Sequence, residues 1–356
     1  FKMRRTQDLP DKESATMFFQ DCKLAHQAQI TGISHSVKEI LPPDLLDLTQ
    51  LQKEANIRYG FTASEVYDIA QSLYEKKLIS YPRTSSRYLT EDVFDSLPPI
   101  MARLLSWELF PAAKGTGGID ISGLSHHIIN AEKANVHHAI IITGIRPGNL
   151  SEKEILVYRL VAGRMLEAFM PPCRIETTNV EAVCAAQHFK AEQTRIIEAG
   201  WHDVFMRSDM VPKSGYSVNE LPEVKKGDNL NVCGCNMVHK KQLPVDPFTD
   251  AELVEYMELN GLGTVSSRTN IIRTLVNRKY IRYSRKYIVP TPKGMFTYET
   301  IRGKKIADTS LTADWEKQLA GLESGMITGQ DFLNRIRTLA KEMTDDIFNT
   351  YSTKEE

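Results

Sequence analysis

Apolar residues recur at helical spacing over several stretches of the chain. One stretch begins with Thr62-Ala63-Ser64-Glu65, a pattern in which the Thr hydroxyl and the Glu carboxylate cap the first turn of a helix reciprocally. The apolar positions that follow are Val66, Ile69, Ala70, Leu73, Tyr74 and Leu78. This spacing predicts a helix with one buried face that ends at Lys76-Lys77, followed by a short strand over 78–81.

Other stretches predict helices in the same way. Residues 44–56 form a short amphipathic pattern, and 151–170 form a longer one that starts at Ser151 and stops at Pro171-Pro172. A further helix is predicted over 251–259, and another from Arg268, whose buried face carries Ile271, Ile272, Leu275 and Val276. The last part, 308–356, predicts two helices separated at Gly329.

Strand patterns are concentrated elsewhere. Residues 28–37 alternate sufficiently for a strand, 177–184 and 189–192 are strand-like, and 223–232 resemble a strand pair around a Gly-Asp turn. Residues 280–290 predict a two-stranded wing that turns at Ser284-Arg285. The chain is therefore mainly helical with a β-rich part, an α+β composition, and its 356 residues predict two or three domains.

Composition narrows the class of protein. The chain is 42% hydrophobic and 25% charged, with no apolar run near the roughly 20 residues of a membrane span and no signal peptide. Its net charge of −1 excludes a basic footprint over the whole chain, so any nucleic-acid site has to be local. The five scattered cysteines lack zinc-ligand spacing and fit a reducing cytoplasm. A start at Phe1 without Met suggests a fragment.

The stretch 79–89, Ile-Ser-Tyr-Pro-Arg-Thr-Ser-Ser-Arg-Tyr-Leu, carries the most pointed chemistry. Tyr81 lies two residues before Arg83 and six before Arg87, and no acidic residue occurs from Lys76 to Thr90. A free phenol is ionised to about one part in a thousand at pH 7, a deficit of roughly 4 kcal/mol that nearby guanidinium charge can partly offset. The same charge neutralises a phosphodiester under attack. Locally, an ordinary half-buried tyrosine remains the alternative.

Two other features add to this picture. His137-His138 opens an apolar run to Thr143, which fits either a structural histidine pair or a phosphate donor or proton shuttle. From Arg268 to Lys293 there are eight Lys or Arg and no acidic residue, with three tyrosines interleaved. This basic wing favours binding of a nucleic-acid backbone over a merely solvated face.

The chain also repeats part of its own pattern. A helix, a basic pair and an apolar strand start occur at 69–79 and again at 271–281, as expected of winged-helix modules. In this register Tyr81 lies opposite Tyr283. Tyr283 is thus a second candidate nucleophile, ranked lower because no Pro-Arg follows it.

Tyr81-Pro82-Arg83-Thr84, followed by Ser86-Arg87-Tyr88-Leu89, resembles the active-site motif of type IA DNA topoisomerases, and is most similar to the topoisomerase III branch. Four further stretches resemble that branch in the same order, together spanning about 270 residues: 48–56, 137–143, 261–268 and 310–317. The resemblance implies an ATP-independent enzyme that cleaves single-stranded DNA through a 5′-phosphotyrosine at Tyr81, passes a strand and rejoins the break.

The family pattern also implies roles for single residues. Tyr81 would be the nucleophile, Arg83 would bind the scissile phosphate, and His137 would contact a phosphate close by. The remaining DNA contacts are expected at Thr84, Ser85, Arg87, His138, Thr264, Ser267 and Arg268. Ser85 stands where the family usually has Asp, Ile142 where it has Pro, and Val265-Ser266-Ser267 where it has Pro-Ala-Thr.

The resemblance implies a multidomain fold of winged-helix-like (CAP-like) domains around a β-rich hinge. The expected parts are a hinge over 1–53 and 173–243, an active-site domain over 54–172, and a single-stranded DNA-binding domain with the basic wing over 244–356. The family's TOPRIM domain, which holds Mg²⁺, has no counterpart here, and no Asp-x-Asp occurs. We therefore expect no metal site in this chain, and binding of single-stranded DNA without relaxation of supercoils.

We further expect a monomer that acts in the cytoplasm, on the bacterial nucleoid, with single-stranded DNA and the TOPRIM domain as partners. Two rival classes remain. A non-enzymatic winged-helix DNA-binding protein explains the basic wing but not Tyr-Pro-Arg-Thr. A tyrosine recombinase would need its tyrosine near the C-terminus, whereas Tyr81 precedes the histidines.

Overall fold

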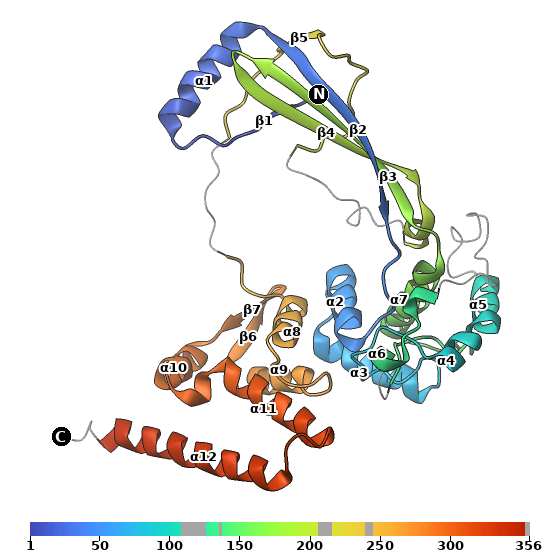
Figure 1. Cartoon of the computed structure of the whole chain (residues 1–356), viewed down its shortest axis with the longest axis vertical. Helices are drawn as coiled ribbons and strands as arrows, with labels where there is room; N and C mark the ends of the chain where they lie inside the picture. Colours follow the sequence, from blue (N-terminus) through green and yellow to red (C-terminus); the bar gives the residue numbers. More distant parts are fainter. Residues whose placement is uncertain (108–125, 135–136, 206–215, 239–244, 353–356) are drawn as a thin grey trace. The chain divides into compact units, whose positions relative to one another are not determined.

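The computed structural model describes residues 1–107, 126–134, 137–205, 216–238 and 245–352. The chain divides into two compact units (Figure 1). The first comprises Phe1–Pro43, Leu105–Ser125 and Met165–Pro244, and the second Asp44–Leu104, His126–Arg164 and Val245–Glu356. Most of the two helical segments that we predicted over 54–172 and 244–356 falls in the second unit, and the predicted division into three domains stays a prediction.

The first unit is built on a five-stranded antiparallel sheet. Its strands are β1 (Arg4–Arg5), β2 (Gln27–Ile40), β3 (Cys173–Cys184), β4 (Gln187–Glu198) and β5 (Asn229–Asn231), in the order β1-β4-β3-β2-β5. Ile30 pairs with Ala182 and Ile33 with Val180, and this face carries the buried core. The β-rich segments on both sides of the helical block therefore form one sheet. The predicted strand pair over 223–232 is wrong, because only β5 pairs there.

A glycine after β4 allows close packing at the end of the sheet where β2 ends and β3 begins. Gly200 begins the short helix η4 (Gly200–Val204) with φ +52°, and a Cβ there would lie 2.4 Å from the carbonyl oxygens of Pro171 and Pro172. This close approach lets the buried Trp201 donate its indole N–H to the carbonyl of Ile40, at 2.9 Å. The predicted pattern also missed helix α1 (Lys12–Ala25), which Asp11 caps.

The second unit is helical. Its first part contains α2 (Leu48–Tyr59), α3 (Ala63–Glu75), α4 (Glu91–Asp95), α5 (Leu97–Ser106), η3 (His126–Ile128), α6 (Ala131–Ala134) and α7 (Glu152–Phe169). The last residues of α5 and of α7 belong to the first unit. The capping box predicted at Thr62 and Glu65 is present at the start of α3. The predicted strand over 78–81 is reduced to a single bridge between Ile79 and Ile142, because Pro82 has no N–H to continue a ladder.

The second part has the order of a winged helix. Helices α8 (Asp250–Leu259) and α9 (Arg268–Asn277) precede the hairpin of β6 (Ile281–Ser284) and β7 (Tyr287–Pro290). Helices α10 (Pro292–Ile301), η6 (Lys305–Ala307), α11 (Thr309–Glu323) and α12 (Gly329–Ser352) follow, of which α10 was not predicted. Ala63 of α3 shares one core with Val254, Met257, Ile272 and Ile288, so the two parts pack as one unit.

The internal repeat is confirmed in its hydrogen bonds. Lys77 and Lys279 each follow a helix with positive φ, 59° and 61°. A threonine hydroxyl donates to the carbonyl of each lysine at 2.6 Å, from Thr143 in the first module and from Thr291 in the second. In the first module the pairing of 78–80 with 141–143 therefore corresponds to the base of the β6–β7 hairpin in the second.

Glu154 ties the start of α7 to the end of α3. Its carboxylate accepts hydrogen bonds from the backbone and hydroxyl of Ser151, from the Ser72 hydroxyl at 2.7 Å and from the Lys76 ammonium at 2.5 Å. The hydrogen bond from Lys76, followed by that from the Ser151 backbone, lowers the pKa of Glu154 to about 2. Because the folded state favours the carboxylate, its contribution is complete above the unfolded pKa near 4.5 and is lost as pH falls toward 2.

We expect Glu154→Gln to lower the free energy of unfolding by about 2 kcal/mol at pH 7, and the difference to shrink steadily below about pH 4.5. Denaturant unfolding of both proteins between pH 7 and pH 3 measures this. Glu152→Gln, in the same helical turn but exposed, is the control and should stay within about 0.5 kcal/mol of the parent. A Glu154→Gln deficit that is the same at every pH would contradict the assignment.

None of the described helices is long and apolar enough to cross a membrane.

Candidate active site

Tyr81 lies six residues after the end of α3. After Lys77 the chain turns, and residues 78–80 run beside 141–143: the Ser80 N–H donates to the Ile141 carbonyl at 2.8 Å, and the Thr143 N–H to the Leu78 carbonyl at 3.1 Å. This short pairing brings the segment that begins at His137 next to Tyr81, although the two are far apart in the sequence. Residues 81–88 then run without regular structure.

The ring of Tyr81 lies between two other rings. The Tyr74 ring of α3 meets it edge-on, with centroids 5.4 Å apart, and the His137 ring lies 4.5 Å away at 46°. Tyr81 is half-buried and His137 is exposed. We predicted Tyr74 on the buried face of α3, but its side chain is 39% exposed and packs against Tyr81 instead. The structure thus places two of the three predicted catalytic residues in contact.

Arg83 lies against α3. Its guanidinium is 5.0 Å from the centre of the Tyr67 ring, and its Nη2 donates to Oε1 of Gln71 at 3.2 Å. Both partners are uncharged, so neither of them neutralises the positive charge of this guanidinium, which lies two residues after Tyr81 in the sequence.

Thr84 stabilises the segment internally. It is 3% exposed, its hydroxyl donates to the His137 carbonyl at 3.0 Å, and the Ser86 N–H donates to the same hydroxyl at 3.0 Å. The Leu48 N–H donates to the Thr84 carbonyl. These bonds hold the tyrosine segment to the histidine segment, and they leave the Thr84 side chain facing protein in this conformation. Ser85 next to it is exposed.

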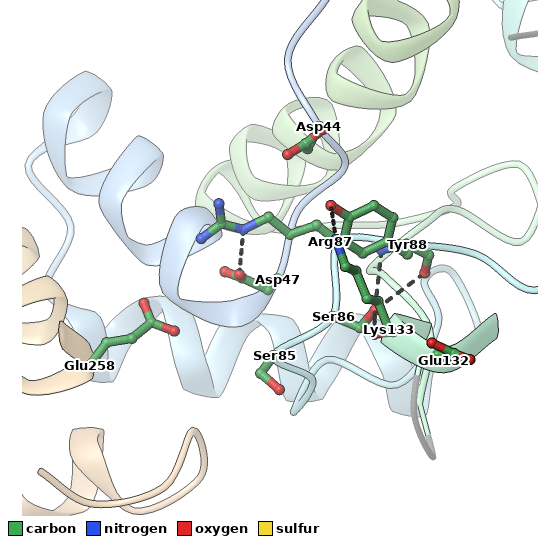
Figure 2. Close-up of a pocket in the computed structure, with 9 residues that line it drawn as sticks. All are labelled: Asp44, Asp47, Ser85, Ser86, Arg87, Tyr88, Glu132, Lys133 and Glu258. Atoms are coloured by element: carbon green, nitrogen blue, oxygen red, sulfur yellow. Dashed lines mark hydrogen bonds and ion pairs between the residues drawn. The ribbon is translucent and has the colours of Figure 1, made fainter. Parts of the chain in front are cut away.

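Arg87 lines a pocket of about 420 Å³. Figure 2 shows its guanidinium directed at Asp47, with Nε 2.6 Å from the carboxylate, and Glu258 of α8 facing the same pocket. Asp47 is 1% exposed and also caps α2 by accepting the Gln50 N–H. The remaining wall comes from Asp44, Ser85, Ser86, Tyr88, Glu132 and Lys133. Arg87 is therefore already paired with a buried carboxylate.

Arg268 is held in a similar way. It is 8% exposed, with Nη1 3.6 Å from Glu258 and 3.5 Å from the Thr49 hydroxyl. Burial raises the pKa of Glu258, the charge of Asp47 adds to the rise, and Arg268 opposes it. A network of two arginines and two carboxylates thus joins the 81–88 segment, the start of α2 and the start of α9.

The turn before α9 needs glycine. Gly263 has φ +72°, and a Cβ there would lie 2.8 Å from the Ser267 hydroxyl. The Thr264 N–H donates to that hydroxyl at 2.8 Å, and the Thr264 side chain is exposed. Within the described residues, no hydrogen bond or ion pair joins Thr264 or Ser267 directly to the 81–88 segment. His138 is half-buried and its Nδ1 lies 2.7 Å from the Ala139 carbonyl.

Tyr283, the second candidate nucleophile, is held differently. Its hydroxyl donates to Oδ1 of the buried Asp250 at 3.1 Å, and Asp250 also accepts the Ala63 N–H at the start of α3. Burial raises the pKa of Tyr283, and the charge of Asp250 raises it further. A phenol that is harder to ionise and already bonded to a carboxylate is a poor nucleophile, so the site centres on Tyr81.

The family model of DNA topoisomerase matches residues 2–334. The chain belongs to this family. Among its relatives, DNA topoisomerase 3 of Bacillus licheniformis is 32% identical over 90% of this chain and 47% of its own length. The enzyme of the same name from Bacillus subtilis is 30% identical over 92% of this chain and 48% of its own length. The resemblance to type IA topoisomerases of the topoisomerase III branch is thereby confirmed, and the chain spans about half the length of these relatives.

The fold agrees with this family. The full-length topoisomerase I of Thermotoga maritima superposes with a TM-score of 0.73 at 22% identity, covering 96% of this chain and 56% of that one. The predicted multidomain α+β architecture is therefore confirmed for this member of the topoisomerase family.

In the part of the chain that the structure describes, no group of three or more His, Cys, Asp or Glu is placed to hold a metal ion. Of the four carboxylates that line the pocket, those of Asp47 and Glu258 pair with arginines.

Several residues of the site were not found from the sequence. Tyr67, Gln71 and Tyr74 lie on α3 and contact Arg83 or Tyr81, and Asp47 and Glu258 pair with Arg87 and Arg268. The i, i+4 spacing of Tyr67 and Gln71 was visible in the sequence. What the sequence lacked was any sign that the segment after the helix folds back over it.

Proposed function

We propose that this chain carries the nucleophile and part of the DNA-binding surface of a type IA DNA topoisomerase. The supporting observation is the packing of Tyr81 against His137, with Arg83 held nearby, in a chain that matches the topoisomerase family over residues 2–334. The substrate is single-stranded DNA, and the reaction is a reversible transesterification.

The chemistry balances without a second substrate. The Tyr81 hydroxyl loses its proton and its oxygen forms a bond to a backbone phosphorus, while the bond from phosphorus to the 3′ oxygen breaks and that oxygen takes up a proton. The product is a 5′-phosphotyrosine and a free 3′ hydroxyl. Attack of that hydroxyl reverses both changes, so the ester conserves the bond energy and ATP is not needed.

The neighbouring side chains fit this reaction. The Arg83 guanidinium can neutralise the phosphate with paired N–H donors, and the exposed His137 ring beside Tyr81 can donate to a phosphate oxygen. Tyr74 and His137 hold the Tyr81 ring on two sides, which reduces the freedom lost when the reaction geometry forms. When bound in the longer protein, Mg²⁺ would supply added charge stabilisation at the phosphate.

The wing supplies a basic surface for the strand. Arg278, Lys279, Arg282, Arg285 and Lys286 are all exposed, and they carry no acidic residue among them. Lys286 lies 5.1 Å from the Tyr287 ring and Lys293 lies 4.7 Å from the Tyr280 ring. Cationic side chains beside aromatic rings suit phosphates and stacked bases of a single strand. We propose that Thr264, Ser267 and Ser85 contribute further contacts.

Arg87, Arg268, Thr84 and His138 also keep a place in this proposal. Arg87 and Arg268 would reach DNA only by exchanging Asp47 or Glu258 for a phosphate. We further propose that the protein works as a monomer on the bacterial nucleoid, together with a TOPRIM domain that holds Mg²⁺. The non-enzymatic alternative accounts for the wing alone, and nothing in the site favours it.

The test is capture of the covalent intermediate. The full-length protein is incubated with an oligonucleotide labelled on the 3′ side of the cleavage site, denatured rapidly with detergent, and digested. We expect the label on the peptide that contains Tyr81. Label on the wing peptide with Tyr283, or linkage through the 3′ phosphate, would refute the proposal. The chain by itself should bind the oligonucleotide but leave supercoiled DNA unrelaxed, and magnesium-dependent relaxation by it would refute that part.

A further inference from the structure

One face of α3 is turned toward the segment that follows Tyr81. Tyr67, Gln71 and Glu75 are spaced four residues apart and so lie on the same face of the helix. The Gln71 amide donates to Oε1 of Glu75 at 2.9 Å, which leaves its oxygen to accept from Arg83 at 3.2 Å. The Arg83 guanidinium also lies 5.0 Å over the Tyr67 ring. Tyr67 and Gln71, neighbours on one face of α3, thus both contact the Arg83 guanidinium.

Arg83 stays in this place at some cost. Its Nε is shielded from solvent and has no hydrogen-bond acceptor among the described residues. An unmade bond on a buried donor is unfavourable. The contacts with Tyr67 and Gln71 must therefore outweigh that cost, which means that they determine where the guanidinium lies.

The partners of Arg83 differ in charge from those of Arg87 in the same motif and of Arg268 in the motif over 261–268. Arg87 is paired with the Asp47 carboxylate and Arg268 with that of Glu258. Arg83 is held by a ring face and an amide oxygen, both neutral. A carboxylate partner would cancel the charge that a phosphate has to meet, whereas neutral partners fix the position and preserve the charge.

We propose that Tyr67 and Gln71 are positioning residues that hold Arg83 for a phosphate of single-stranded DNA, with Glu75 orienting the Gln71 amide. The inference rests on the proposed function, in that Arg83 contacts the DNA. Tyr67 and Gln71 themselves act through Arg83 and need not touch the strand.

The experiment is a double-variant cycle on DNA binding. Fluorescence anisotropy of a labelled oligothymidylate gives the affinity of the protein over a series of salt concentrations. Arg83→Ala should weaken binding and reduce the slope of log affinity against log salt by about 0.7, the value for one phosphate contact on a single strand. Gln71→Ala and Tyr67→Ala should each weaken binding roughly 3- to 10-fold, as expected for one cation–π contact or one hydrogen bond to a charged group.

Two matched variants separate positioning from folding. Tyr67→Phe keeps the ring face and should bind within about twofold of the parent, and Gln71→Ala should have no further effect once Arg83 is alanine. Thermal unfolding of each variant checks that it is folded. The inference is overturned if Gln71→Ala weakens binding equally with and without Arg83, or if Tyr67→Phe is as harmful as Tyr67→Ala.

The cycle also distinguishes this inference from the function beneath it. If Arg83→Ala itself leaves affinity and salt slope unchanged, the role of Arg83 at a phosphate is refuted, and the positioning role with it. If Arg83→Ala has its expected effect and the Gln71 and Tyr67 variants do not, the function stands and the positioning role alone is refuted.

Discussion

Tyr81→Phe should form no covalent DNA adduct, whereas Tyr283→Phe should form it at nearly the parental rate. The first substitution removes the one oxygen that we propose attacks phosphorus, while leaving the ring between Tyr74 and His137. Removal of a nucleophile on which the reaction depends lowers the rate on the order of 10⁴-fold or more. The fold should be little affected, since no described partner accepts a hydrogen bond from the Tyr81 hydroxyl.

Tyr283→Phe is the matched control because the two tyrosines occupy equivalent positions of the repeat. The Tyr283 hydroxyl donates to the buried Asp250, so its loss should cost about 1 kcal/mol of stability and spare the chemistry. Adduct formation by the full-length proteins on a labelled single strand, trapped with detergent, measures both variants. Adduct that persists in Tyr81→Phe and disappears in Tyr283→Phe would reverse the assignment.

Arg164→Ala should destabilise the second unit by about 3–5 kcal/mol, the cost of leaving one member of a buried ion pair alone. Arg164 on α7 lies 2.8 Å from Glu54 on α2, with side chains only 9% and 13% exposed. Its other terminal nitrogen donates to the carbonyl of Asp44 at 3.2 Å. The arginine therefore ties α7 to the start of the segment that carries Asp47 and α2, and a loss of this size is a large part of the stability of an ordinary domain.

The control lies on the same helix. Lys153 pairs with Glu65 at 2.6 Å, but these side chains are 55% and 40% exposed, so Lys153→Ala should cost less than about 1 kcal/mol. Urea unfolding followed by circular dichroism gives both values. If Arg164→Ala and Lys153→Ala shift the urea midpoint of unfolding equally, the burial of the Arg164–Glu54 pair does not make it stronger than the exposed Lys153–Glu65 pair.

Three arginines that look alike in the sequence have different partners in the structure. In the sequence, Arg83, Arg87 and Arg268 are alike: each stands in a motif with small polar neighbours and no adjacent acid. In the structure, Asp47 and Glu258 reach two of them from other elements, and Gln71 reaches the third. Charge counted along a segment thus overestimates what the segment offers to DNA, because side chains from distant segments neutralise part of it.

Helix prediction succeeded where a local physical cause existed. The capping box at Thr62, the apolar spacing of α3 and α7, and the Pro-Pro stop after α7 all act within one or two turns of the chain. Helix prediction failed for α1 and α10, which were not predicted. Strand prediction failed over 78–81, where a strand was expected. The bridge that remains at Ile79 depends on a partner at Ile142, and no local pattern indicates that pairing.

The sequence by itself determined the elements whose stability is local, the motif around Tyr81, its order relative to the histidine pair and the basic wing, and through them the family. Only the tertiary structure decided what surrounds each of the two candidate tyrosines. Asp250 occupies the hydroxyl of Tyr283, while Tyr74 and His137 flank the ring of Tyr81. The physical reason is that ionisation and charge depend on burial and on partners within a few ångströms, and those partners come from segments that sequence distance does not relate.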